Sequence, residues 1–365
     1  MFSRRTGKIQ HVRVQSSSCE ILQVVCEGQM AQAINYIPLT GAAAIGDLVV
    51  LNTMAVELRL GSGGYHFVIL NLNSVEKHSE YAGHIMKLRY TPLQVRVLAV
   101  EEEASCHHLQ MKKAVSLLGM PVIVAELHSM LAPFVLTVKQ KKPALRIAYL
   151  MTDGGALPAF FSHTVQVLKE RQLICGIVTA GHAFGGDLEA VNVYSGLLAA
   201  CHVLEADVTI VCMGPGVAGT ATPYGFSGME VADNLNRVHS LQGRAVALPR
   251  LSFADERARH QGLSHHTMTA LSQATFLPVD LPLPVLCDEQ NVKLEQQIGT
   301  HGLAEKHHLH RYNGLSLAHL EEERSLCRTM GRSLDEDPAF FLAAVATAQH
   351  ITHFCTDSVS ESVEQ

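Results

Sequence analysis

Three glycine-rich segments, each directly after an apolar run of strand length, are the parts of this sequence best suited to bind a ligand. They are Asp153-Gly154-Gly155, Gly181-His182-Ala183-Phe184-Gly185-Gly186-Asp187 and Gly214-Pro215-Gly216-Val217-Ala218-Gly219-Thr220. Backbone N–H groups at such turns, and at the helix starts that follow them, can hold an anion. We therefore predict that a small phosphorylated or otherwise anionic ligand binds at Gly154, Gly155, Gly185, Gly186, Gly214, Gly216, Gly219, Thr220, Thr222 and Arg250.

The third segment matches the spacing G-x-G-x-x-G of dinucleotide-binding turns. That fingerprint requires the helix to begin inside the motif. Here Pro215 and Pro223 interrupt, and the helix is expected to start only near Gly228. The next apolar run ends at Arg250 instead of at an acidic residue that could hold a ribose hydroxyl. A dinucleotide-dependent oxidoreductase is therefore kept only as an alternative function.

Four side chains are candidates for catalysis, namely Asp153, His182, His265 and His266. Carboxylates and imidazoles can transfer protons and bind divalent metals. The sequence has 21 histidines, but the neighbours His265 and His266 would point about 100° apart on a helix. We interpret the histidine clusters as structural or solvated. A divalent metal assembled from distant strand ends, for instance by Asp153, His182 and His265, stays open.

The elements that would carry these residues differ between the two halves of the chain. Short alternating or β-rich stretches separated by glycine turns occupy residues 8–14, 19–26, 29–36, 47–51 and 65–71. Such spacing predicts a small β-barrel domain over residues 1–92, since closing the sheet removes its exposed edges.

Beyond this region, apolar strands alternate with helix-length segments. The strands are predicted at residues 95–100, 121–127, 145–151, 174–179, 208–213 and 245–248, with a further one near 276–279. The helices are predicted at residues 105–118, 131–139, 157–171, 189–204, 229–241 and 265–273. This rhythm indicates a doubly wound, mostly parallel sheet with helices on both faces, so that the three glycine turns share one edge.

The fold class is therefore α/β, with three predicted regions. The β-barrel is followed by a Rossmann-like α/β domain over residues 93–284. A helical C-terminal segment, residues 285–365, is expected to pack on that domain, because residues 338–354 have an apolar face.

Composition excludes several classes of function. The net charge is −6, which disfavours the broad basic surface of a nucleic-acid-binding protein. No apolar run approaches the roughly eighteen residues of a membrane-spanning helix. The nine cysteines form no C-x-x-C pair, which is typical of a reducing compartment. We expect a cytoplasmic protein without nucleic-acid or membrane partners, and leave open whether it forms a homo-oligomer.

Five longer segments, at residues 51–68, 83–92, 220–228, 259–267 and 329–341, resemble a bacterial family of uncharacterised proteins of about this length. They contain the strings SGGYHFVI, GHIMKLRYTP, TPYGFSG and SHHT. The resemblance implies a bacterial, cytoplasmic setting and brings no activity with it. It singles out six residues for attention, which are His66, His84, Lys87, Arg89, His265 and His266.

The leading hypothesis is an enzyme that binds its small anionic ligand at the glycine-rich strand ends, with metal assistance left open. One alternative is a non-catalytic ligand-sensing or assembly protein, in which the barrel recognises a partner. The other is the dinucleotide-dependent oxidoreductase considered above.

Overall fold

The computed structural model describes residues 2–60, 63–74 and 82–354. Ser62 of the resembling segments and the last residues of the expected C-terminal region, 355–365, lie outside the described residues. The chain divides into two compact units. The first unit comprises Met1–Ala82 and Leu88–Arg96, and the second comprises Gly83–Lys87 and Val97–Gln365.

The first unit contains a closed five-stranded barrel with the strand order β1-β2-β3-β5-β4. The strands are β1 (Arg4–Ser16), β2 (Cys19–Cys26), β3 (Gln29–Tyr36), β4 (Leu48–Asn52) and β5 (Tyr65–Asn71), and the short helices are α1 (Ile37–Thr40) and α2 (Met54–Glu57). The long strand β1 pairs with both β2 and β4, and its register shifts twice against β2. A bulged strand bends, and this bend lets one strand serve both sides of a closed barrel. Its interior is apolar, with Ile9, Leu22 and Leu51 fully buried.

The second unit is built on an eight-stranded sheet with the order β11-β10-β9-β12-β8-β13-β16-β17. All of its strand pairs are parallel. The strands are β8 (Pro121–Ala125), β9 (Ile147–Thr152), β10 (Gly176–Ala180), β11 (Leu188–Ala190), β12 (Val208–Met213), β13 (Arg244–Leu248), β16 (Asp280–Pro284) and β17 (His308–Tyr312). The predicted fold class, a small barrel followed by a parallel α/β sheet and a C-terminal helix, is confirmed.

Some predicted elements differ from the observed ones. The expected strand at 95–100 is only β7 (Val95–Val97), which with β6 (Ile85–Lys87) lies outside the barrel and the eight-stranded sheet. The expected helix at 105–118 shrinks to α3 (His108–Met111). The strand expected near 276–279 is β16, a few residues later, and it pairs with β17 even at Pro282 and Pro284. β11 and β17 were not predicted, since neither has a continuous apolar run.

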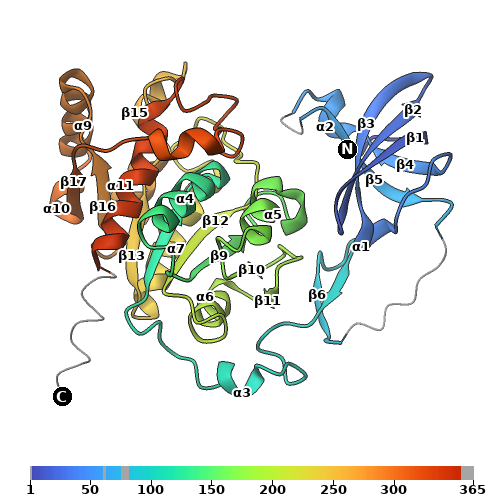
Figure 1. Cartoon of the computed structure of the whole chain (residues 1–365), viewed down its shortest axis with the longest axis horizontal. Helices are drawn as coiled ribbons and strands as arrows, with labels where there is room; N and C mark the ends of the chain where they lie inside the picture. The colour runs from blue at the N-terminus through green and yellow to red at the C-terminus, as the bar shows by residue number, and fades with distance from the viewer. Residues whose placement is uncertain (1, 61–62, 75–81, 355–365) are drawn as a thin grey trace. The chain divides into compact units, whose positions relative to one another are not determined.

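Helices cover both faces of this sheet (Figure 1). The crossovers through α4 (Leu131–Lys141) and α5 (His163–Glu170) connect strands in the direction of β11. The crossovers through α6 (Val193–His202) and α7 (Glu230–Ser240) connect strands in the direction of β17. Right-handed crossovers therefore place the two pairs of helices on opposite faces. The C-terminal helix α11 (Pro338–Phe354) packs beside α4 and against β16. It is buried along nearly its whole length, as expected of a helix that is apolar on all sides.

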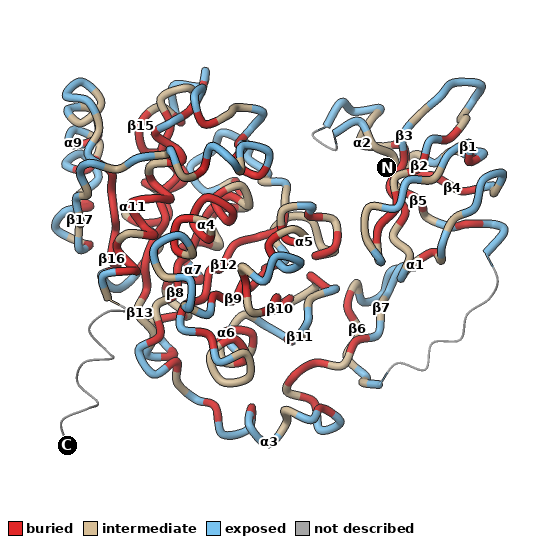
Figure 2. Tube along the Cα trace, in the orientation of Figure 1, coloured by how far each residue is buried: buried red, intermediate tan, exposed pale blue. Residues whose placement is uncertain are grey.

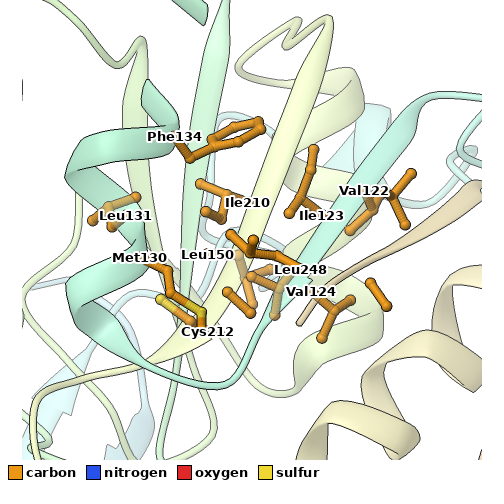
Figure 3. Packing of buried hydrophobic residues seen from close by; sticks show 14 of the residues in the cluster. Val122, Ile123, Val124, Met130, Leu131, Phe134, Leu150, Ile210, Cys212 and Leu248 are labelled. Atoms are coloured by element: carbon orange, nitrogen blue, oxygen red, sulfur yellow. The ribbon is translucent and has the colours of Figure 1, made fainter. Parts of the chain in front are cut away.

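Because both faces are covered, the central strands are buried from end to end (Figure 2). Figure 3 shows Ile123 of β8, Leu150 of β9 and Ile210 of β12 packed together with Met130 and Phe134 at the helical layer. This continuous core makes the sheet a rigid support for the loops at its carboxyl edge. Among the described residues, no helix is both long and apolar enough to cross a membrane.

The remaining elements connect or flank these strands and helices. They are η1 (His128–Met130), η2 (Ala159–Phe161), η3 (Ser227–Met229), β14 (Leu251–Ser252), η4 (Ala258–His260), β15 (Gly262–Leu263), α8 (His265–Thr269), η5 (Ala270–Ala274), α9 (Asp288–Thr300), α10 (Leu303–Lys306) and η6 (Ala318–Glu323).

The chain reverses direction between two neighbouring strands at the centre of the sheet. From β9 it continues to β10, toward one edge, whereas from β12 it continues to β13, toward the other. Such a reversal opens a crevice outside the carboxyl ends of the two strands, where doubly wound sheets bind ligands. The first and third glycine-rich segments follow these two strands directly.

Candidate functional site

The glycine turns after β9 and β12 touch each other through their backbones. A Cβ atom on Gly155 would overlap the carbonyl oxygen of Gly214, and one on Gly214 would overlap that of Ala156. The turn after β10 joins them, because a Cβ on Gly181 would overlap the Asp153 carboxylate. The three segments thus lie side by side, and glycine at these positions is required by close approach of the chain.

Replacing Gly155 by alanine is expected to destabilise the second unit by about 3 kcal/mol, because the new methyl group must push two backbone segments apart. Gly299→Ala, in α9, is the matched control. No atom lies within 4 Å of a Cβ at that position, so alanine there should be neutral or slightly stabilising. Urea denaturation of both variants measures the difference. Equal stabilities would contradict the close packing of the two turns.

The turn after β10 uses its own backbone donors internally. The Gly185 N–H donates to Glu189 Oε1 at 2.7 Å, and the Gly186 N–H donates to Thr179 Oγ1 at 3.2 Å. The His182 N–H donates to Asp153 Oδ2 at 2.8 Å. These three N–H groups are therefore engaged, so the anion-binding role expected of Gly185 and Gly186 has no support in their hydrogen bonding.

The threonines of the third segment also serve the loop itself. Thr220 Oγ1 and Thr222 Oγ1 lie 3.0 Å apart, and both hydroxyls bond to the backbone of Gly225. Gly216 differs from them, since its φ of 109° favours glycine and no atom lies within 4 Å of a Cβ there. Of the glycines predicted in this segment, Gly216 is the one where an added Cβ would meet no other atom.

Arg250 binds an internal anion instead of facing a ligand. Its Nη1 donates to Glu126 Oε1 at 3.0 Å, and both side chains are buried. His266 Nδ1 lies 2.7 Å from the same carboxylate oxygen. Burial alone would raise the pKa of Glu126, but the hydrogen bond from His266 and the charge of Arg250 hold it below its usual value. Glu126 was not predicted from the sequence, although an acid directly after the apolar run of β8 was a usable signal.

Two of the predicted catalytic histidines lie together with a third. His265 and His266 have ring centroids 4.2 Å apart, and each lies 5.0 Å from the ring of His260. Asp153 and His182 do not belong to this group. The two sets are linked along the edge through the third glycine segment, since a Cβ on Gly219 would contact His266 Nε2 at 3.6 Å.

A pocket of about 350 Å³ opens at the carboxyl ends of β9 and β10. It is lined by Thr152 at the end of β9 and Asp153 directly after it, by Asn192, Val193 and Tyr194 at the start of α6, and by Glu230, Asp233, Asn234 and Arg237 of α7. A pocket at this place on a doubly wound sheet is the expected ligand site.

Glu230 is the most perturbed acid of this pocket. Its Oε1 accepts a hydrogen bond from the Thr152 hydroxyl at 2.6 Å. Burial raises the pKa of Glu230 to about 7, and the charge of Asp153 acts in the same direction. The sequence did not single it out, because an acid in the first turn of a helix usually has only a capping role.

The start of α6 offers donors to the same pocket. The Asn192 side chain accepts from the Ser195 N–H at 3.1 Å and caps the helix. The N–H groups of Val193 and Tyr194 fall in the first turn, where a helix has no acceptor for them. Arg237 donates to Asn234 Oδ1 at 2.6 Å, and its guanidinium lies 5.9 Å from the centre of the Tyr194 ring. Positive charge and helix N–H groups thus meet at one side of the pocket.

A larger groove, of about 640 Å³, lies on the barrel. Its charged groups pair with one another, since Arg5 contacts both Glu27 and Glu57. His66, one of the residues singled out by the resemblance, also lines it. Burial lowers the pKa of His66, hydrogen bonds lower that of Glu57 and burial raises that of Cys26, all of them away from neutrality, so we place the proposed chemistry in the second unit.

The other residues singled out by the resemblance have structural contacts or lie on the surface. Lys87 is 1% exposed, and its Nζ donates to Glu189 Oε2 at 2.7 Å and to the carbonyls of Thr179 and Ala183. His84 Nδ1 lies 2.6 Å from Glu102. Arg89 is exposed. Lys87 thus ties the segment of β6 to the sheet edge at β10 and β11.

Lys87→Met is expected to lower the free energy of unfolding by about 3–5 kcal/mol, because it leaves the Glu189 carboxylate without its opposite charge and the carbonyls of Thr179 and Ala183 without this donor. The double variant Lys87→Met/Glu189→Gln should lose less than the sum of the two single changes. Thermal and urea denaturation measure these values. Additive losses would show that the pair is not coupled.

The fold and the site define an α/β protein with a doubly wound parallel sheet, a polar carboxyl edge and a pocket at the carboxyl ends of β9 and β10. Residues 32–348 match a family described as a protein of unknown function (DUF3866), and the chain belongs to that family. No curated protein matches the chain. The predicted membership of a family without an established activity is thereby confirmed.

Proposed function

We propose that this chain is an enzyme that binds a small phosphorylated or otherwise anionic ligand in the pocket at β9, α6 and α7, and that Glu230 transfers a proton to or from it. The observation that carries the proposal is the position of Glu230 on the wall of a 350 Å³ pocket at the carboxyl ends of β9 and β10. Strongly shifted acids in such pockets are candidates for catalysis.

The environment of Glu230 suits general acid–base catalysis near neutral pH. A group whose pKa is about 7 is present in both protonation states at that pH. Thr152 holds one carboxyl oxygen, which orients the group. Asp153 supplies a second carboxyl beside it in the pocket. Two acids in different environments are the arrangement that lets one donate a proton while the other accepts one.

The ligand's anionic group binds at the start of α6. The free N–H groups of the first helical turn and the positive end of the helix dipole favour a phosphate or carboxylate there. Arg237 adds a full positive charge on the facing helix α7. Asp153 and Asp233 would repel an anion, so the charged end of the ligand lies toward α6 and Arg237 and its reacting end toward Glu230.

The cellular setting belongs to the same proposal. A reducing, cytoplasmic location is supported by the eight cysteines in the described part of the chain, which are all free thiols. The buried Cys212 and Cys327 pack as small apolar side chains. A bacterial origin rests on the resemblance alone.

A thermal-shift screen tests ligand binding directly. The full chain is heated with sugar phosphates, nucleotides, coenzymes and small carboxylic acids, and a ligand at about 100 times its Kd should add about 2.7 kcal/mol of stability. Arg237→Gln should weaken this effect, whereas Arg13→Gln, an exposed change on the barrel, should not. If no anionic compound stabilises the chain, the proposal fails.

The same screen separates the proposal from its alternatives. Binding without turnover of any ligand would favour the ligand-sensing or assembly protein. Stabilisation by nicotinamide nucleotides alone would favour the oxidoreductase. The geometry disfavours the latter, because η3 and α7 begin at Ser227 and Glu230, well after the last glycine of the G-x-G-x-x-G motif.

A further inference from the structure

We propose that His260, His265 and His266 together bind one divalent transition-metal ion, with Zn²⁺ as the best-fitting ion, at the carboxyl edge of the sheet. Each side chain offers one ligand nitrogen, and these nitrogens all lie within 4.8 Å of one another. Nothing in the proposed proton transfer by Glu230 is needed for this site.

The hydrogen bonds leave the right nitrogens for a metal. His260 Nδ1 bonds with Ser264 Oγ at 2.8 Å, and His266 Nδ1 bonds with Glu126 at 2.7 Å, so Nε2 is the remaining nitrogen of both rings. His265 Nε2 is buried and has no hydrogen-bond partner. A buried polar atom without a partner is costly, and a metal ion would satisfy it.

The surroundings of His266 resemble the outer shell of known metal sites. Histidine ligands usually give their second nitrogen to a carboxylate or another acceptor, which fixes the ring and raises its basicity as a ligand. Glu126 has this role for His266 and is itself held by the buried Arg250. Phe226 stacks on the His266 ring at 3.8 Å with an angle of 5° between the planes, which holds the imidazole in place.

Local structure explains how three rings close in sequence come to face one another. Ser264 caps α8 by accepting the His266 N–H, so His265 and His266 occupy the first turn of that helix. His260 is the last residue of the short helix η4, and the chain then runs through β15 to the start of α8. The chain between them thus folds back, and the spacing of an ideal helix does not apply.

The buried charge beside the three rings is compensated within the protein. The nearest buried cation, Arg250, is paired with Glu126 and lies 3.5 Å from Asp255. Its charge is therefore largely balanced before a metal binds.

Three imidazoles with room for a further ligand are typical of a catalytic Zn²⁺ site. That room lies beside Gly219, whose missing side chain leaves the space next to His266 Nε2 open. A second group of metal-ligating residues, Asp280, His310 and His350, has a different character. There the carboxylate already binds Arg244 and His310 at 2.7 and 2.8 Å, so an ion would have to displace these partners.

The experiment uses the full chain and the metal alone. Bound metal is removed with a chelator, and the protein is loaded with Zn²⁺ and desalted. The zinc content is then measured by inductively coupled plasma mass spectrometry. A second sample is loaded with Co²⁺, and its visible absorbance spectrum is recorded. We expect about one ion per chain and the intense bands of four-coordinate Co²⁺. His265→Gln should abolish both signals, and His310→Gln, in the second group, should leave both unchanged.

Further variants keep the test decisive. Glu126→Gln retains the three ligands but weakens the support of His266, and it should lower the Zn²⁺ affinity about 10- to 100-fold. Circular dichroism checks that each variant is folded. The proposal is overturned if the folded wild-type chain retains no stoichiometric ion, or if His265→Gln binds as well as the wild type. Because no ligand or turnover is involved, this outcome is independent of the proton-transfer proposal.

Discussion

Glu230→Gln is expected to lower turnover at least about 100-fold while making the folded protein more stable above pH 7. Glutamine keeps an oxygen for the Thr152 hydroxyl, but it has no proton to exchange. The two effects have opposite signs because burial of a charged carboxylate costs folding free energy, and the same burial gives the group its pKa near neutrality.

The pH dependence follows from the direction of this pKa. Between pH 4.5 and about 7 the native chain holds a proton on Glu230 that the unfolded chain releases, so the free energy of unfolding falls as the pH rises through this window. The rise in the pKa of Glu230 from 4.5 to about 7 corresponds to about 3 kcal/mol of folding free energy. Because Glu230 is partly exposed to solvent, we expect half of this value or more to be measured.

Urea denaturation at pH 5 and pH 8 measures this effect. The decrease in stability from pH 5 to pH 8 should be smaller by about 1.5–2.5 kcal/mol in Glu230→Gln than in the wild type. Asp233→Asn is the control, an exposed acid of the same pocket and the same helix. Identical pH profiles for the wild type and Glu230→Gln would show that Glu230 titrates normally and would remove the support for its catalytic role.

Glu126→Ala is expected to cost about 3–5 kcal/mol of stability at pH 7, because it leaves the Arg250 guanidinium and the His266 imidazole buried without their shared acceptor. The pKa of Glu126 is lowered, so its contribution is present above pH 4.5 and is lost as the pH falls below that value. The variant should therefore differ least from the wild type in acid.

Two further variants isolate the buried pair. Glu256→Ala is the control. It removes an exposed acid that follows Arg250 closely in the sequence, and it should change stability by less than about 0.5 kcal/mol. Glu126→Leu/Arg250→Met removes both charges and should lose less than Glu126→Ala alone. The single variants Glu126→Leu and Arg250→Met complete the comparison. If the double variant loses as much free energy of unfolding as these two together, the carboxylate and the guanidinium are not energetically coupled.

The patterns visible in the sequence are local ones. Continuous apolar runs such as 208–213 predict strands buried on both faces, and β12 has those bounds. Glycine turns directly after such runs predict loops at the carboxyl edge, and the turns at Gly155 and Gly214 do meet there. The helix at 338–354 is likewise as predicted. These features depend on residues within one turn or one strand, which a single sequence displays directly.

Local sequence patterns do not predict the order of the strands in the sheet. β12 lies between β9 and β8, so the switch point next to Thr152 arises only from pairing across the sheet. Glu230 reaches Thr152 from 78 positions away, and its raised pKa comes from burial that no local pattern specifies. An acid in the first turn of a helix looks the same in the sequence whether it is solvated or buried.

By itself, therefore, the sequence determined the fold class, the glycine-rich edge and the candidates Asp153, His265 and His266. Only the tertiary structure decided that Glu126, 140 positions before His266, orients this histidine, and that His260 folds back to face it. The physical reason is that hydrogen bonding and desolvation act between atoms within a few ångströms, whatever their separation along the chain. Glu230 and the three histidines are the functional groups that we propose at this edge.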